Sequence, residues 1–122
     1  FKVFDLEVAR TGVGAADIER HGLTVISAVS HHNSRGHHYP SAAHITTVLF
    51  AERGSGRLLG AQMVGADVVA KRMDVLATAL HAGMTLADIE ALDLSYAPPY
   101  APVYDPVLIA ASVARKALDK AG

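Results

Sequence analysis

Residues 44–64, HITTVLFAERGSGRLLGAQMV, contain two apolar segments separated by a short polar turn. Residues 44–51 and 57–64 are rich in β-branched and other apolar side chains, which predicts two strands. Between them, Glu52-Arg53-Gly54-Ser55-Gly56 has the glycines and polar residues of a hairpin turn. A further strand is predicted just before this hairpin, at residues 23–29. Three strands so close together in the sequence predict an antiparallel sheet.

The N-terminal residues predict one more strand and a short helix. Residues 1–8 alternate apolar and polar side chains, as a half-buried strand does, and Thr11-Gly12-Val13-Gly14 is expected to end it. A helix is expected from Ala15 to His21, with Gly22 as its stop. The two glycines before this helix match part of a dinucleotide-binding fingerprint. Asp17 stands where the third glycine belongs, so we expect no phosphate site here.

The C-terminal half has the 3.6-residue period of helices. In residues 66–82 the apolar side chains fall on one stripe, which contains Val69, Met73, Leu76 and Leu80. A shorter helix is expected after Thr85, which acts as its N-cap together with Asp88 in a capping box. A closing helix is expected over residues 107–120, after Asp105 as N-cap and Pro106 as first residue.

The expected element order is therefore β-α-β-β-β-α-α-α. We predict an α+β fold in which an antiparallel sheet carries helices on one face. The length of 122 residues, with 51% apolar and 19% charged residues, fits a single globular domain over residues 1–122. The chain starts without Met inside a strand-like pattern, which predicts that it is a fragment of a longer protein.

Composition also narrows the functional classes. A net charge of −1 gives no electrostatic basis for binding nucleic acid or an anionic membrane. No apolar run has the length of a membrane span, and no signal peptide is visible. The chain has no cysteine, which removes disulfides, thiolate metal sites and redox thiols. We expect a cytoplasmic protein.

Residues 94–106, LSYAPPYAPVYDP, hold four of the five prolines and three of the four tyrosines. Proline fixes φ and removes a backbone donor, so this segment cannot lie inside a helix or a central strand. A stiff segment of this kind suits the presentation of aromatic rings to another molecule. The alternative is a linker whose tyrosines pack on the chain's own core.

Five of the seven histidines lie between His31 and His44. Imidazoles bind zinc or nickel, which makes a stand-alone metal- or ligand-binding module that uses this loop the alternative function. The spacing of the histidines matches no established zinc motif, and Asn33-Ser34-Arg35-Gly36 is typical of a solvated turn. The chain shows no nucleophile-elbow motif and no His-Glu-x-x-His motif, so we expect a binding or assembly module and not a complete enzyme.

Four motifs occur in an order that resembles one enzyme family. They are Phe1-Lys2-Val3-Phe4-Asp5-Leu6 with Arg10-Thr11-Gly12, His38-Tyr39-Pro40, Leu59-Gly60-Ala61-Gln62-Met63-Val64-Gly65, and Tyr96-Ala97-Pro98-Pro99-Tyr100 with Asp105-Pro106-Val107. Together they resemble the C-terminal dimerisation domain of FAD-dependent pyridine nucleotide–disulfide oxidoreductases, over essentially the whole chain. The tyrosine–proline motif is similar to that of coenzyme A–disulfide reductases and of the related NADH oxidases and polysulfide reductases.

The resemblance implies a homodimer in which each copy covers the flavin and disulfide site of its partner subunit. It implies that Tyr39 and Tyr96 are catalytic in the partner's site, where a phenol can protonate a leaving thiolate, with Tyr100 and His38 contacting the substrate. FAD and NAD(P)H would bind to other domains of the parent flavoenzyme and none to this chain, so the chain alone is expected to be inactive.

The histidine-proline and glutamate pair of glutathione reductase-like members is missing, which favours the branch that uses a single cysteine. Coenzyme A disulfide, polysulfide, oxygen and peroxide are all compatible substrates, and NADH and NADPH are both compatible reductants.

Overall fold

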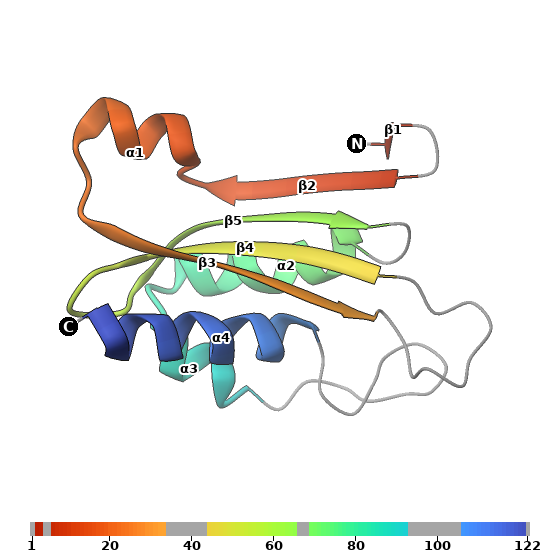
Figure 1. Cartoon of the computed structure of the whole chain (residues 1–122). Coiled ribbons are helices and arrows are strands. Elements are labelled where there is room, and N and C mark those ends of the chain that lie inside the picture. Colours follow the sequence, from red (N-terminus) through yellow and green to blue (C-terminus); the bar gives the residue numbers. More distant parts are fainter. Residues whose placement is uncertain (1, 4–5, 34–43, 66–68, 93–105, 122) are drawn as a thin grey trace.

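The computed structural model describes residues 2–3, 6–33, 44–65, 69–92 and 106–121. In chain order its elements are β1 (Lys2–Val3), β2 (Leu6–Gly12), α1 (Ala15–His21), β3 (Val25–Asn33), β4 (His44–Glu52), β5 (Leu58–Gly65), α2 (Val69–His81), α3 (Leu86–Glu90) and α4 (Pro106–Ala121). Figure 1 shows one sheet, with α2 and α4 along it, α3 beside α4, and α1 beyond the end of β2. The predicted α+β fold is confirmed.

The sheet has the strand order β1-β2-β5-β4-β3, and every neighbouring pair is antiparallel. The predicted hairpin joins β4 to β5, and its turn is closed by the Glu52 N–H, which donates to the Arg57 carbonyl at 2.8 Å. Strands β3 and β4 pair from Val25 opposite Glu52 to Asn33 opposite His44. Strand β2 crosses to the far side of this three-stranded unit and pairs with β5.

Two strands differ in extent from the prediction because pairing, and not local pattern, sets their ends. The expected strand over residues 1–8 is two strands, and β2 continues through Thr11 and Gly12, which were expected to end it. Its pairing with β5 runs as far as Gly12 opposite Gly60. The strand expected over residues 23–29 starts at Val25 and runs to Asn33, since β4 offers a partner along that whole length.

One face of the sheet carries the core. On β4, alternate residues are buried against the helices, and these are Ile45, Thr47, Leu49 and Ala51. Helix α2 covers β2 and β5, and helix α4 covers β3 and β4. Their buried side chains join the same cluster: Val69, Met73, Leu76, Val107, Ala110, Ala111 and Ala114. The opposite face is exposed around Val29, which is 53% exposed.

The helix ends follow simple chemical rules. The predicted capping box is present in α3, where the Thr85 hydroxyl accepts from the Asp88 N–H at 3.2 Å and the Asp88 carboxylate accepts from the Thr85 N–H at 2.9 Å. At the start of α2, the Ala70 N–H donates to the Glu7 carboxylate at 2.6 Å, which places a negative charge at the positive helix end. The expected N-cap Asp105 and residues 66–68 of the longer predicted helix lie outside the described residues.

Helix α1 is the exception to the expected one-sided arrangement. It spans the predicted residues and ends at Gly22, which adopts φ +60, but none of its residues is buried. It therefore serves as the crossover between β2 and β3 and not as part of the helical layer (Figure 1). In the described part of the chain, no helix has the length and apolarity needed to span a membrane.

The ends of β2 and β5 approach so closely that only glycine fits. A Cβ atom on Gly60 would lie 2.0 Å from the Val13 carbonyl oxygen, and one on Gly12 would lie 2.2 Å from the Leu59 carbonyl oxygen. The Val13 N–H donates to the Leu59 carbonyl at 3.0 Å, which fixes the two backbones at this spacing. Gly12 also has φ +69, a conformation that disfavours other residues.

Candidate functional site

The four site residues expected from the resemblance lie in two connecting segments outside the described residues. His38 and Tyr39 belong to residues 34–43, and Tyr96 and Tyr100 belong to residues 93–105. The described elements that flank these segments do have known places. The end of β3, the start of β4 and the start of α4 all lie at the same end of the molecule (Figure 1). The two segments are therefore both attached to that end of the sheet.

The described residues at this end of the molecule are paired or buried. Asn33 is paired with His44, so the 34–43 segment leaves and re-enters the sheet at neighbouring positions. Pro106 and Val107 open α4 and are both buried, with Val107 at 0% exposure. The described residues that border residues 34–43 and those from 106 onward thus belong to the paired sheet and to a buried helix start.

The glycine-containing turn before α1 is occupied by the chain's own acid. The Gly14 N–H donates to the Asp17 carboxylate at 3.0 Å, and this hydrogen bond, with Arg20 and Arg10 nearby, lowers the pKa of Asp17 below its usual 3.8. A carboxylate therefore takes the backbone donor that a phosphate would need.

The histidine loop lies mostly outside the described residues, and only His31 is seen with its side chain. It lies on β3 opposite Thr46, with 3.0 Å between its Nδ1 and the Thr46 hydroxyl oxygen. Among the residues whose side chains the structure describes (6–31, 45–65, 69–92 and 106–121), no three His, Asp or Glu side chains are grouped as a metal would require. The metal-binding alternative depends on the other histidines of this loop, whose side chains lie outside the described residues, and it stays a prediction.

A bidentate ion pair joins α3 to α4. The Arg115 Nε donates to Glu90 Oε2 at 2.6 Å and its Nη2 donates to Glu90 Oε1 at 3.2 Å, while Nη1 reaches Asp119 at 3.4 Å. The Arg115 hydrogen bonds lower the pKa of Glu90 and Glu90 in turn raises the pKa of Arg115. The sequence prediction missed this pair, because the partners are 25 residues apart and no local pattern links them.

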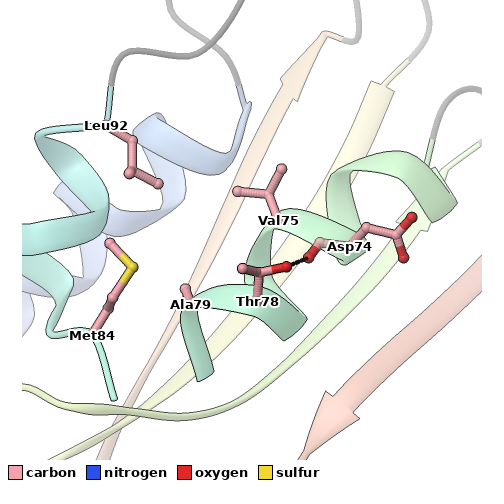
Figure 2. Close-up of a pocket in the computed structure, with 6 residues that line it drawn as sticks. All are labelled: Asp74, Val75, Thr78, Ala79, Met84 and Leu92. Carbon is pink, nitrogen blue, oxygen red and sulfur yellow. Dashed lines mark hydrogen bonds between the residues drawn. The ribbon is translucent and has the colours of Figure 1, made fainter. Parts of the chain in front are cut away.

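An apolar hollow of about 340 Å³ opens between α2 and α3 (Figure 2). Val75, Ala79, Met84 and Leu92 form its walls, and the Asp74 carboxylate points away from it. The Thr78 hydroxyl donates to the Asp74 carbonyl at 2.8 Å and is thereby used within the helix. The hollow therefore offers apolar contact but no oriented acid or base, which fits a packing surface and not a catalytic pocket.

The lowered carboxyl pKa values predict that the fold weakens in acid. Glu90, Asp17 and Asp88 all have a pKa below their ordinary values, the last because of its two hydrogen bonds to Thr85. Their contribution is complete above the unfolded pKa and is lost as the pH falls through the folded pKa. We expect the urea concentration at the unfolding midpoint to decrease as the pH is lowered from about 6 to about 3. In Glu90→Gln this decrease should be smaller.

The control for this measurement is Glu19→Gln, on the exposed surface of α1. It should leave the slope of stability against pH nearly as in the parent chain. An unchanged slope in Glu90→Gln would show that the Glu90–Arg115 pair does not contribute to the acid response.

Comparison with known proteins identifies the family. Residues 1–106 match the family model described as the pyridine nucleotide-disulphide oxidoreductase dimerisation domain. A solved NAD-dependent persulfide reductase from A. fulgidus has 45% sequence identity and a TM-score of 0.94, and the match covers 99% of this chain and 23% of that one.

Two curated relatives point the same way. An NAD(P)H sulfur oxidoreductase (CoA-dependent) of Pyrococcus furiosus is 37% identical over 112 residues, 92% of this chain and 25% of its own length. A coenzyme A disulfide reductase of Staphylococcus haemolyticus is 26% identical over 99 residues, 81% of this chain and 22% of its own length. The chain thus spans about a quarter of the length of these relatives.

The chain belongs to the dimerisation-domain family of the pyridine nucleotide–disulfide oxidoreductases. The expected family is confirmed, as are the antiparallel sheet and its layer of helices.

Proposed function

We propose that this chain is the homodimerisation domain of a flavin-dependent NAD(P)H:disulfide oxidoreductase of the coenzyme A–disulfide or persulfide reductase type. In this proposal the domain lies at the C-terminal end of a longer flavoenzyme, whose other domains bind FAD and NAD(P)H. Each copy completes the active site of its partner subunit with Tyr39 and Tyr96. Tyr100 and His38 lie against the sulfur substrate there.

The observation that carries the proposal is the common attachment of the two tyrosine-bearing segments. Residues 34–43 join the end of β3 to the start of β4, and residues 93–105 lead from α3 to the start of α4, which lies at the same end of the sheet. A single patch of the domain can thus supply side chains from both segments to one site on a second subunit. The family match to a dimerisation domain supports the presence of a second subunit, which we propose is a copy of the same chain.

The proposed chemistry requires a hydroxyl group that can donate a hydrogen bond or a proton. Reduction of a mixed disulfide breaks a sulfur–sulfur bond and leaves a thiolate, which is stabilised by a hydrogen-bond donor or a proton at the right distance. A tyrosine hydroxyl is both a donor and an acceptor. Proline-rich flanks around Tyr96 restrict its backbone and so reduce the entropy lost when the ring is placed.

The proposal assigns flavin and nicotinamide binding to other domains of the flavoenzyme. In this chain the N–H of Gly14, in the turn before α1, is occupied by the Asp17 carboxylate. The chain also lacks cysteine, so the redox thiol must come from elsewhere in the flavoenzyme. These facts support a division of labour in which this domain assembles the dimer and positions tyrosines.

The direct test is to measure whether the chain is a monomer or a dimer in solution. Sedimentation equilibrium should show a dimer at micromolar concentration, with the same dissociation constant in the presence of zinc or of a chelator. A chain that stays monomeric up to millimolar concentration would contradict the proposal. Assembly that appears only with added zinc would favour the metal-binding module instead.

A further inference from the structure

The three methionines of the chain differ in how easily a solute can reach them. Met63 on β5 is 0% exposed, and Met73 on α2 is 6% exposed. Met84, between α2 and α3, is only partly buried and lines the apolar hollow between these helices. Its side chain points toward Leu92 across the hollow (Figure 2). Met84 is therefore the methionine that a small solute can reach most readily in the folded chain.

The hollow beside Met84 has room for a small oxidant. Its volume of about 340 Å³ is far more than the roughly 15 Å³ in which a water molecule can be placed. Hydrogen peroxide is only slightly larger than water. A thioether that meets it gives up two electrons and gains one oxygen atom, while the peroxide O–O bond breaks and water is released. The product is methionine sulfoxide.

Met84 also belongs to the structure that ends α2. Gly83 has φ +70, and its N–H donates to the Leu80 carbonyl at 3.1 Å. The Met84 N–H donates to the Ala79 carbonyl at 3.0 Å. These are the two hydrogen bonds of a Schellman motif, in which the residue at the Met84 position commonly packs on the residue at the Ala79 position. Met84 does pack against the core cluster, to which Ala79 belongs.

The same residue joins α2 to two other elements. The Met84 carbonyl accepts from the Leu58 N–H at 3.0 Å, at the start of β5. Thr85, directly after Met84, is the N-cap of α3. The Leu86 N–H then donates to the Gly56 carbonyl at 2.8 Å, next to the start of β5. Met84 thus lies at the junction of α2, α3 and β5.

A sulfoxide is poorly accommodated in this hollow. Its oxygen makes a formerly apolar side chain polar. Val75, Ala79 and Leu92 offer that oxygen only apolar contact. The Thr78 hydroxyl already donates to the Asp74 carbonyl at 2.8 Å. The sulfoxide oxygen would therefore have to turn toward water, which draws the side chain away from Ala79.

We propose that Met84 is a reversible oxidation site, at which hydrogen peroxide converts the thioether to a sulfoxide and loosens the junction of α2, α3 and β5. This site is independent of the proposed function, because it is built entirely from described residues of the chain itself. Methionine sulfoxide reductases return the sulfoxide to the thioether, so the loosening can be undone.

Peptide mapping by mass spectrometry tests the selectivity of the oxidation. In the folded chain treated with hydrogen peroxide, Met84 should be oxidised about tenfold or more faster than Met63 and Met73, which react only after local opening. In the chain unfolded by urea the three rates should be similar, because burial no longer protects any of them. Equal rates in the folded chain would overturn the assignment of Met84.

Urea unfolding tests the effect on stability. Peroxide treatment should raise the equilibrium constant for unfolding about fivefold or more. Met84→Leu removes the sulfur and keeps an apolar side chain of similar volume, so this variant should have the same urea midpoint before and after treatment. Met63→Leu is the matched control and should still be weakened by peroxide. If peroxide weakens Met84→Leu as much as the parent chain, the proposal is wrong.

Hydrogen exchange tests whether the loosening is local. In the oxidised chain, the Leu58 and Met84 N–H groups should exchange about tenfold or more faster, because their acceptors lie at the junction. The Leu23 N–H, which donates to the Ile18 carbonyl on α1, is the control and should keep its rate. Methionine sulfoxide reductases should restore the exchange rates and the urea midpoint. Unchanged exchange at Leu58 and Met84 in a chain oxidised at Met84 would contradict the proposal.

Discussion

Replacement of Tyr96 by Phe, in a complete flavoenzyme that carries this domain, is expected to slow disulfide reduction about 100-fold or more without preventing dimerisation. The phenol is proposed to supply a hydrogen bond or proton to the departing thiolate, a role that contributes about 10²–10⁴-fold when it is lost. Phe keeps the ring and removes only the hydroxyl. Single-turnover reduction of coenzyme A disulfide, followed by flavin absorbance, measures the step directly.

The matched control is Tyr104→Phe. Tyr104 lies in the same proline-rich segment, has no assigned role, and should retain nearly full activity. If both variants are equally slow, the loss of activity comes from a disturbance of residues 94–106 as a whole and not from the Tyr96 hydroxyl. If neither is slow, the proposed chemical role of Tyr96 is wrong.

Mixed dimers test whether the tyrosine acts across the interface. A subunit with Tyr96→Phe is combined with a subunit that lacks the redox cysteine of the flavin domain. If Tyr96 acts in the partner's site, one of the two sites in the mixed dimer is intact and activity returns. If Tyr96 acts within its own subunit, both sites are defective and the mixed dimer stays inactive.

Gly60→Ala is expected to destabilise the fold by about 3 kcal/mol or more, because the new methyl group meets backbone and not a movable side chain. Its Cβ would lie 2.0 Å from the Val13 carbonyl oxygen and 2.8 Å from the Val13 nitrogen. Relief would require β2 and β5 to separate where their pairing ends. Urea unfolding followed by circular dichroism measures the change, against a total stability of about 5–15 kcal/mol for a typical domain.

Gly14→Ala provides the comparison for steric crowding. Gly14 is also buried, but a Cβ there would meet its nearest neighbour, the Gln62 amide nitrogen, at 3.5 Å, an ordinary contact. Gly14→Ala should lower the free energy of unfolding by about 1 kcal/mol or less, which is the usual cost of alanine in place of glycine at a helix N-cap. Similar losses in the two variants would show that the close approach at Gly60 is not the cause.

Local chemistry was enough to predict much of this fold. The β4–β5 hairpin is encoded by a glycine-containing turn between apolar runs, and the α3 capping box by Thr85 and Asp88 three residues apart. The stripe of Val69, Met73 and Leu76 was predicted to face the core and is buried. In each of these cases the cause lies within a few residues of the effect.

What depends on distant residues was predicted poorly. The ends of β2 and β3 are set by their partners β5 and β4, and the Glu90–Arg115 pair joins positions 25 residues apart. The roles of Tyr39, Tyr96, Tyr100 and His38 came from resemblance to a family and not from local chemistry. These roles stay predictions, and the Tyr96 variants above test one of them.

The strand order also governs how the sheet can be assembled during synthesis. Strand β2 precedes β3, β4 and β5 in the sequence, but its long partner is β5, with Glu7 opposite Gly65. While β3 and β4 emerge from the ribosome they can pair with each other, whereas β2 has only the two residues of β1 beside it. We therefore expect β2 to join the sheet last, after β5 has formed and Gly60 can lie against Val13.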